Sequence, residues 1–223
     1  ALIKLYEQTG DKRYEKSAKL VCDWVLELQD EDGAFWANKT HSYVYAHAHC
    51  YAIEGLLYAY SHFKDLKYKK SIFEGTNWLE VNYFKNKIGI LGTSKCSPTF
   101  ESDEQVTTNL LSRIIRFFIP RKMIAIDATI QFSRILMFNY LINKDSKTLI
   151  LSKKIKNKIL PIILVEENNL VKGLHSRVGV ELGIHRKSPI LGTWASLFLI
   201  GDLILGDRIK KDDKIKDHIK SLF

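Results

Sequence analysis

The chain has 223 residues, a formal net charge of +9 and three cysteines without a CxxC pair, which suits one sizeable core and argues against a disulfide framework. Sparse cysteines are typical of a reducing compartment, so we expect a cytoplasmic protein. No segment approaches the ~18 consecutive apolar residues of a membrane-spanning helix, and no nucleic-acid-binding motif is visible, so we expect neither a membrane nor a nucleic acid as a partner.

The positive charge comes mainly from lysines that are spread over several segments. They fall on predicted outer faces of helices, for example in 153–158 and 210–220. Lysines in such positions most often form a solvated surface. The alternative is that they attract an anionic partner such as an acidic glycan or a nucleic acid.

The first part of the chain predicts the end of one helix, then a second helix and a turn. The first helix closes at Thr9-Gly10, and Asp11 is well placed to cap the next helix, which runs over about 11–29. That helix has one narrow apolar face with charged residues on the opposite face, as in an amphipathic outer helix that is exposed to solvent on one side. An acidic turn containing Gly33 then returns Phe35 and Trp36 to the core.

The stretch 44–63 predicts an inner helix, because almost every position is apolar or aromatic and no separate polar face exists. His47, His49 and Glu54 lie among these apolar residues. Burying them costs free energy unless they are paired, so they either satisfy one another or line a wet cavity. His47 and His49 are two positions apart and therefore point to different sides of the helix. An amphipathic outer helix follows to about Tyr83.

Residues 84–102 contain several glycines and a proline and cannot continue a helix. A capped helix over 103–118 follows. A second inner helix then runs over 127–142. Its polar residues share one face because they are spaced by four and three positions, and they are Asp127, Gln131 and Arg134.

The last third of the chain predicts a Lys-rich outer helix over 146–164 and then a change of pattern. Short alternation near 165–187 predicts a small β hairpin or extended loop. Ser188-Pro189 is a good cap for a third inner helix over 190–205, and a charged helix ends the chain. The predicted fold class is therefore all-α, with inner helices that alternate with outer ones.

Several short stretches resemble α/α-toroid proteins. The outer-helix and turn pattern of that superfamily is matched by Leu5 to Tyr14, Trp24 to Gln29 and Asp32 to Phe35. Two further stretches, His49 to Leu57 and Asp127 to Gln131 with Arg134, resemble inner helices of its carbohydrate-active, six-hairpin glycosidase-like members. The resemblance implies an α/α toroid in which the loops that lead into the inner helices converge on one end and line a pocket.

The number of predicted helices departs from a complete toroid. Six hairpins need about twelve helices, whereas about eight or nine are predicted here. We expect 1–223 to form a single α/α-toroid-like domain, an incomplete or truncated (α/α)6-like barrel that lacks N-terminal hairpins. Its oligomeric state stays open.

The resemblance selects candidate catalytic residues among the carboxylates near the starts of the inner helices. Glycoside hydrolysis needs one carboxylic acid and a second carboxylate as base or nucleophile, and we take Asp103, Asp127 and Glu181 as candidates without a fixed pairing. Each has a structural alternative. Asp103 and Asp127 are also suited to cap a helix, and Glu181 has Arg177 and Arg186 nearby as ion-pair partners.

The expected convergence of the loops at one end of the toroid also selects candidate binding residues. Flat aromatic side chains stack on sugar rings, which points to Trp36, Tyr43 and Trp194, although aromatics at helical spacing are more often part of a core. Arg134 or Lys187 would bind the carboxylate of an acidic sugar, and an epimerase would use His47 or His49 with His185 for proton transfer. Gln131 completes the candidate pocket wall.

We expect no cofactor and no metal. The positions of His47, Cys50 and Glu54 on roughly one face make a zinc site conceivable, but a hydrogen-bonded core network is the simpler interpretation. The predicted function is that of a carbohydrate-active protein, a hydrolase, lyase or epimerase that acts on a neutral or acidic saccharide. The alternative is a non-catalytic scaffold or binding protein built from helical hairpins.

Overall fold

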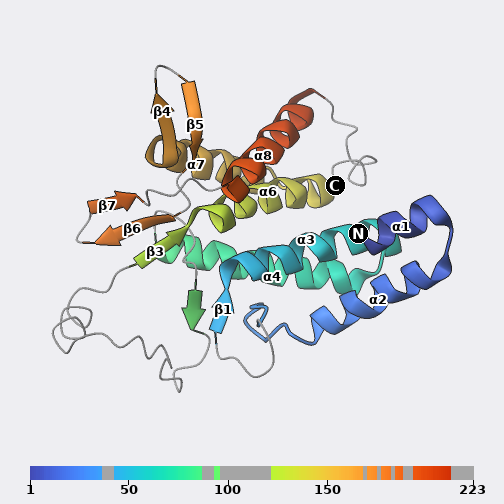
Figure 1. The fold of residues 1–223 in the computed structure, drawn as a ribbon. Helices are drawn as coiled ribbons and strands as arrows, with labels where there is room; N and C mark the ends of the chain where they lie inside the picture. Colours follow the sequence, from blue (N-terminus) through green and yellow to red (C-terminus); the bar gives the residue numbers. More distant parts are fainter. Residues whose placement is uncertain are drawn as a thin grey trace.

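A computed structural model of the chain describes residues 1–36, 43–86, 93–95, 122–167, 170–174, 177–181, 184–187 and 193–211. The helices are α1 (Leu2–Thr9), α2 (Lys12–Leu26), α3 (Ala46–Phe63), α4 (Leu66–Asn86), α6 (Ile126–Asn143), α7 (Ser146–Ile163) and α8 (Thr193–Lys211). They pack as hairpins in which inner helices α1, α3 and α6 are each followed by an outer helix, and α8 packs on the other side of α6 (Figure 1). This arrangement confirms the predicted all-α toroid-like fold.

One turn is used three times to join an inner helix to the next outer helix. Each inner helix ends in a residue with left-handed backbone, whose N–H donates to the carbonyl of a tyrosine four positions earlier. The next residue is always an aspartate whose carboxylate accepts the backbone N–H two positions later, which caps the outer helix. The three copies of this turn are Tyr6, Gly10, Asp11, Arg13; Tyr60, Lys64, Asp65, Lys67; and Tyr140, Lys144, Asp145, Lys147.

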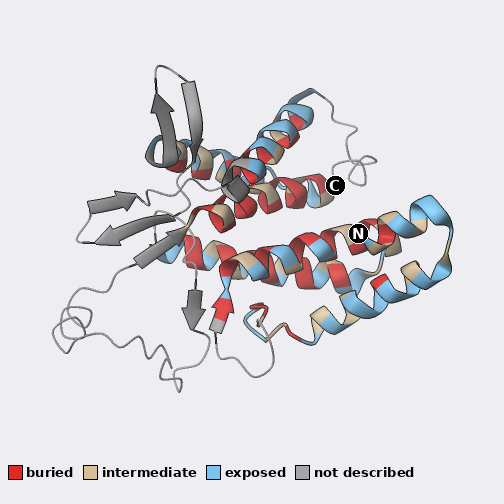
Figure 2. Ribbon diagram, viewed as in Figure 1, coloured by how far each residue is buried: buried red, intermediate tan, exposed pale blue. Residues whose placement is uncertain are grey.

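The core lies between the inner helices and their outer partners, and α6 is buried along most of its length (Figure 2). α6 contacts α3 on one side, α8 on the other, and α4 and α7 behind. Phe35 also returns to the core as predicted, because Gly75 of α4 leaves room for its ring; a Cβ at Gly75 would lie 2.9 Å from it. Trp36, in contrast, stays partly exposed.

The strands are short and lie next to the N-terminal ends of the inner helices (Figure 1). β1 (Tyr43–Tyr45) pairs with β2 (Thr93–Lys95), and β3 (Lys122–Ala125) pairs with β6 (Arg177–Glu181), which also pairs with β7 (Ile184–Lys187). β4 (Leu164–Glu167) and β5 (Leu170–Leu174) form a separate hairpin. The predicted β excursion near 165–187 is thus confirmed, as two hairpins instead of one.

Some predicted boundaries differ from the structure. The inner helix predicted over 190–205 is α8, which begins at Thr193 and continues to Lys211. Gly206 is accommodated inside α8, so the charged residues near 207–211 extend this helix. β1, β2 and β3 were not predicted, since strands of three or four residues show almost no alternation. The predicted helix over 103–118 lies outside the described residues.

His49 is a fully buried residue that ties the acidic turn to α4. The Phe35 N–H donates to His49 Nδ1 (3.0 Å), and His49 Nε2 lies 2.9 Å from the Gly75 carbonyl oxygen. Because Nδ1 accepts, Nε2 carries the proton and donates to that carbonyl. Burial lowers the pKa of His49 to about 4.

A second buried polar contact joins α3 to α6. Arg134 Nε donates to Glu54 Oε1 (2.9 Å), Arg134 Nη2 donates to the same oxygen, and Gln131 Nε2 donates to Glu54 Oε2 (3.3 Å). The Glu54 and Arg134 side chains are only 10% and 17% exposed. Burial raises the pKa of Glu54 even though Arg134 opposes that change. Glu54 is thus paired within the core, but with Arg134 and Gln131 of α6 instead of the His47 and Cys50 partners that the sequence suggested on its own helix.

His49 predicts a pH dependence of stability. The pKa of His49 is lowered from 6.5 to about 4 in the folded protein. Above pH 6.5 the imidazole is neutral in both the folded and the unfolded state. As the pH falls from 6.5 toward 4, the unfolded state binds a proton before the folded state does, so the folded state loses stability. The full loss is about 3 kcal/mol. Urea unfolding of His49→Gln, whose amide replaces both hydrogen bonds, should show a shallower loss over this window. An equally steep loss of unfolding free energy in the variant would contradict the proposed protonation of His49. The difference in unfolding free energy between the two proteins at pH 8, where the imidazole is neutral, serves as the internal control.

The Glu54–Arg134 pair predicts strong energetic coupling. Replacing either partner alone leaves a buried charge without its partner and should cost about 3–5 kcal/mol, whereas Glu54→Leu with Arg134→Met should cost less than the sum of the single replacements. A double-mutant cycle by chemical unfolding measures this coupling, which we expect to exceed about 1 kcal/mol. The exposed Lys70–Glu74 pair of α4 is the matched control and should show about 0.5 kcal/mol or less. Equal coupling energies in the two cycles would contradict the view that the buried Glu54–Arg134 pair is more strongly coupled than an exposed pair.

Candidate functional site

The N-terminal ends of α3 and α6 lie side by side and each follows a strand. β1 runs directly into α3 at Ala46, and β3 runs directly into α6 at Ile126. In both cases the residue before the helix has extended backbone and provides no side-chain cap. The first turns of the two helices therefore present their side chains at the same end of the molecule, where the β strands gather (Figure 1).

His47 of α3 and Asp127 of α6 meet at this end. His47 Nδ1 lies 3.4 Å from Asp127 Oδ2, and the two side chains are 36% and 29% exposed. The other carboxylate oxygen of Asp127 accepts the backbone N–H of Ala128 (2.8 Å). Asp127 is therefore not the N-cap of α6, a position that Ala125 occupies. Its carboxylate is bound to the helix backbone, lies beside the imidazole and stays partly accessible to solvent.

Aromatic side chains surround His47. The Tyr51 ring lies edge-on to His47 with 4.4 Å between ring centroids, and Phe198 of α8 lies within 6 Å of both. Tyr51 is 42% exposed, whereas Phe198 is buried. Three helices thus contribute to one partly exposed patch that contains an imidazole, a carboxylate and a phenol ring. We call His47, Tyr51, Asp127 and Phe198 the helix-end cluster.

The Glu54–Arg134 pair lies one to two turns deeper along the same helices. The Arg134 guanidinium stacks over the Phe198 ring, with 5.1 Å between its Cζ and the ring centroid. Gly201 of α8 gives the guanidinium space, since a Cβ there would lie 3.2 Å from Arg134 Nη1. Arg134 therefore contacts α3 through Glu54 and α8 through Phe198 and Gly201, and it joins α3, α6 and α8 beneath the cluster.

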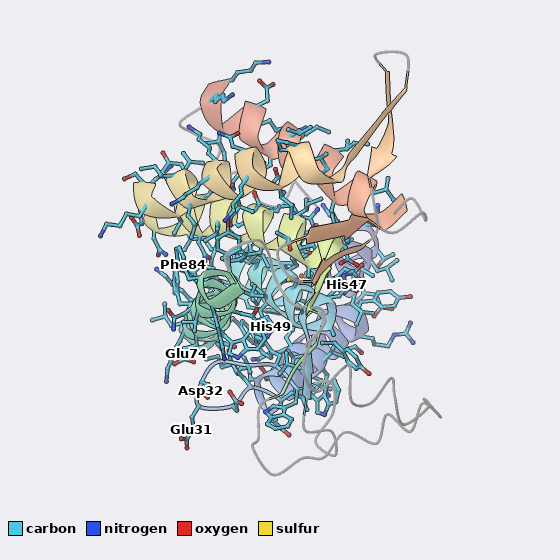
Figure 3. The ribbon with its side chains drawn as sticks, turned by 90° about the vertical axis from the view of Figure 1, so that its left-hand side faces the viewer. Glu31, Asp32, His47, His49, Glu74 and Phe84 are labelled. Carbon is cyan, nitrogen blue, oxygen red and sulfur yellow. The ribbon has the colours of Figure 1, made fainter. Side chains whose placement is uncertain are left out.

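The structure separates the predicted site residues into two groups. It brings His47, Asp127, Gln131 and Arg134 together on adjoining faces of α3 and α6. It places His49 on another side of α3, fully buried with both ring nitrogens engaged, as the spacing of the two histidines predicted (Figure 3). His49 is therefore not available to a ligand. Gln131 is also fully buried and supports Glu54 instead of facing solvent.

Trp36 lies apart from the helix-end cluster. It lines a separate pocket of about 220 Å³ together with Glu27, Leu28 and Gln29 at the end of α2. The backbone of Trp36 donates to the Leu28 carbonyl oxygen (3.0 Å). Its predicted role in saccharide stacking stays a prediction, and it would concern this smaller pocket.

The other predicted residues are placed only through their backbones or not at all. Tyr43 begins β1, and Trp194 is the second residue of α8, so both belong to the same end of the molecule. In the three-stranded sheet, Ile124 pairs with Val178, which pairs with Lys187, so Lys187 is close in register to the start of α6. Glu181 and His185 lie further along that sheet, near Lys122. Asp103 lies outside the described residues.

Sequence reasoning missed Tyr51 and Phe198, and it considered Glu54 only together with His47 and Cys50, as a conceivable zinc site or a hydrogen-bonded core network. Tyr51 was hidden because a tyrosine in an apolar helix is most often a core residue. Its position four residues after His47 is the one signal that would have placed both on one face. Phe198 contacts the cluster from α8, and no local pattern reports a contact between helices that far apart in sequence.

The described residues contain no group of three His, Cys, Asp or Glu side chains that could hold a metal ion. Cys50, which shares a face with His47 and Glu54, instead directs its Sγ to the Ala128 carbonyl oxygen at 3.7 Å. Within the described ranges, no helix is both long and apolar enough to cross a membrane.

No family model and no curated protein matches the chain in sequence. In structure it is similar to the GH76A alpha-1,6-mannanase of Salegentibacter sp. HEL1_6, of which an inactive variant was solved in complex with alpha-1,6-mannotetrose. The TM-score is 0.66, with 17% sequence identity over 97% of this chain and 56% of that one. The same enzyme in complex with alpha-1,6-mannotriose gives a TM-score of 0.67.

A second similar structure is the cellobiose 2-epimerase of Bacillus thermoamylovorans B4167, with a TM-score of 0.62 and 14% identity over 90% of this chain and 50% of that one. Two enzymes with different reactions thus share this arrangement of helical hairpins. The chain spans about half the length of each enzyme. It has an α/α-toroid fold.

Proposed function

We propose that the chain belongs to a carbohydrate-active enzyme whose saccharide binds at the helix-end cluster. The observation that carries the proposal is the contact between His47 and Asp127, 3.4 Å apart on the first turns of two neighbouring inner helices. Titratable side chains that converge at the end of inner helices are candidates for acid and base chemistry. The similarity in fold to a mannanase and a sugar epimerase supports a saccharide as the ligand.

The aromatic part of the cluster suits a sugar ring. Tyr51 is exposed on one side and fixed on the other by its edge-on contacts with His47 and Phe198. A fixed aromatic ring presents apolar area to the C–H face of a sugar and loses little rotamer freedom on binding. His47 and Asp127 beside it provide hydrogen-bond partners for sugar hydroxyls.

The charges of the cluster favour proton transfer over hydrolysis. Among the described side chains there, Asp127 is the accessible carboxylate, since Glu54 is held by Arg134 and Gln131. His47 Nδ1 lies 3.4 Å from Asp127 Oδ2, and we assign proton transfer at a sugar carbon to this imidazole and carboxylate together. We therefore place an epimerase or lyase reaction first. Hydrolysis needs a second carboxylate, for which Asp103 and Glu181 stay the candidates.

Binding and turnover are tested with alpha-1,6-mannotriose, cellobiose and a glucuronate-containing disaccharide in deuterated water, followed by NMR. Epimerisation replaces the hydrogen at the reacting sugar carbon by deuterium, elimination gives an unsaturated sugar, and hydrolysis gives new reducing ends. We expect exchange or elimination with at least one sugar. His47→Gln and Asp127→Asn should each lower the rate by about 10²-fold or more, as expected for groups that transfer protons.

Matched replacements on the same elements provide the controls. His62→Gln lies at the other end of α3, and Asp65→Asn lies in the turn that follows, so both should keep the rate within about twofold. Tyr51→Ala should weaken binding about fivefold, since aromatic stacking is worth about 1 kcal/mol. Binding without turnover would support the non-catalytic alternative, and binding that is unaffected by all three cluster variants would contradict the proposed site.

A further inference from the structure

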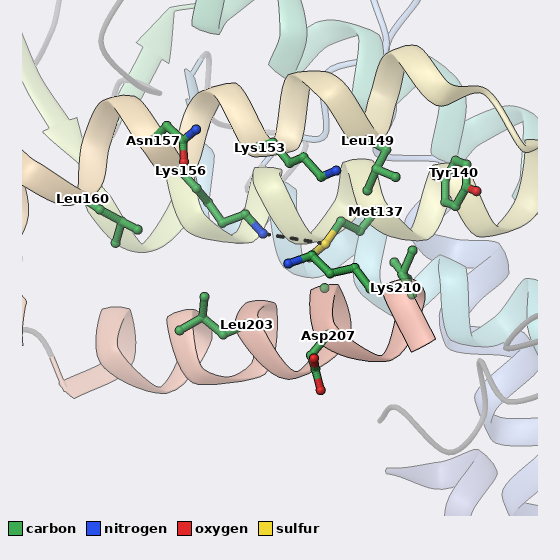
Figure 4. Close-up of a pocket in the computed structure, with 12 residues that line it drawn as sticks. Met137, Tyr140, Leu149, Lys153, Lys156, Asn157, Leu160, Leu203, Asp207 and Lys210 are labelled. Atoms are coloured by element: carbon green, nitrogen blue, oxygen red, sulfur yellow. Dashed lines mark hydrogen bonds between the residues drawn. The ribbon is translucent and has the colours of Figure 1, made fainter. Parts of the chain in front are cut away.

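A second cavity lies at the opposite end of the inner helices from the helix-end cluster. It has a volume of about 510 Å³ and is enclosed by the C-terminal halves of α6 and α8 and by the middle of α7 (Figure 4). This size is within the usual range for pockets that bind small molecules. The pocket shares no residue with the cluster of His47, Tyr51, Asp127 and Phe198.

Three lysines give this pocket its charge. Lys153 and Lys156 come from α7 and Lys210 comes from α8, and Figure 4 shows the ends of Lys156 and Lys210 directed toward Met137 at the centre. Lys156 Nζ lies 3.8 Å from Met137 Sδ. Lys153 and Lys210 have no acidic partner among the described residues, which leaves two uncompensated positive charges at the pocket.

The remaining charged groups are already paired. Lys156 Nζ lies 2.8 Å from Asp202 Oδ2, and Asp202 is fully buried, where Ser133 Oγ donates to its other oxygen (3.0 Å). Asp207, the acidic residue in the pocket lining, pairs with Lys211 at 2.8 Å. The buried pair fixes the Lys156 side chain, so that one ammonium group is preorganised. The exposed side chains of Lys153 and Lys210 add two further positive charges to the pocket.

The walls of the pocket are apolar. Leu149 and Leu160 of α7 and Leu203 of α8 line it, and Leu203 is 51% exposed. A positively charged pocket with aliphatic walls is complementary to a molecule that has an anionic head and an apolar body. Attraction between ammonium groups and an anion fixes the head, and burial of apolar area stabilises the body.

We infer that this pocket, between α6, α7 and α8, binds an amphipathic anion, a carboxylate or phosphate that carries an aliphatic chain. Lys153 and Lys210 contact the head, and the leucines contact the chain. This site is independent of the saccharide site, since it rests on other residues at the other end of the helices. It also gives part of the chain's lysine excess a role beyond a solvated surface.

Isothermal titration with decanoate and decyl phosphate, below their micelle-forming concentrations, tests the inference on the whole chain. Both should bind at one site, and Lys153→Met with Lys210→Met should raise Kd at least about tenfold, since each hydrogen bond between charged groups is worth about 1.5–3 kcal/mol. The matched control, Lys147→Met with Lys154→Met, removes the same charge from α7 outside the pocket and should change Kd by less than about twofold.

Gly206→Ala provides a second, independent variant. The new methyl group would lie 3.6 Å from Lys156 Nζ and 3.7 Å from Met137 Sδ, so it covers the floor without a clash, and alanine favours the helix. We expect weaker binding of both probes with no loss of stability. Equal affinity for the uncharged decyl maltoside, equal affinity for inorganic phosphate, or equal weakening by the control pair would each overturn the inference.

Discussion

The structure depends on the burial of α6, which has neighbours on every side and therefore must pair each of its polar side chains inside the protein. Toward α3, Arg134 and Gln131 bind Glu54. Toward α7 and α8, Ser133 contacts Ser152 and Asp202. Toward α4, Asn139 donates to Thr76 Oγ1 at 2.9 Å. Apolar packing alone would tolerate rotation of each neighbouring helix, but these contacts require one orientation, because any other leaves a buried polar group without a partner.

The same contacts set the geometry of the candidate site. Glu54 lies about two turns after His47 on α3, and Arg134 lies about two turns after Asp127 on α6. When Arg134 binds Glu54, the first turns of α3 and α6 lie next to each other, so that His47 contacts Asp127. Stacking of Arg134 on Phe198 adds α8 to this frame. The buried ion pair is thus a positioning device for the exposed pair, and the cluster is assembled from three helices that are far apart in sequence.

The alternation of inner and outer helices was predictable, because it follows from how widely apolar residues are spread around each helix. So were the shared face of Asp127, Gln131 and Arg134 and the opposite directions of His47 and His49, which depend only on helical spacing. The repeated turn at Gly10, Lys64 and Lys144 was readable in the sequence but was not noticed, since lysine occupies the left-handed position where glycine is usual. Which polar groups of different helices would meet could not be predicted, because that depends on how the helices pack.

The central claim is that saccharide binds where α3, α6 and α8 meet at their N-terminal side. A crystal structure of the chain soaked with alpha-1,6-mannotriose or cellobiose tests this most directly. We predict density for a sugar ring against Tyr51, with hydroxyl groups within hydrogen-bond distance of His47 and Asp127. Sugar bound only in the small pocket beside Trp36, or an unoccupied helix-end cluster under conditions where solution binding is saturated, would contradict the account.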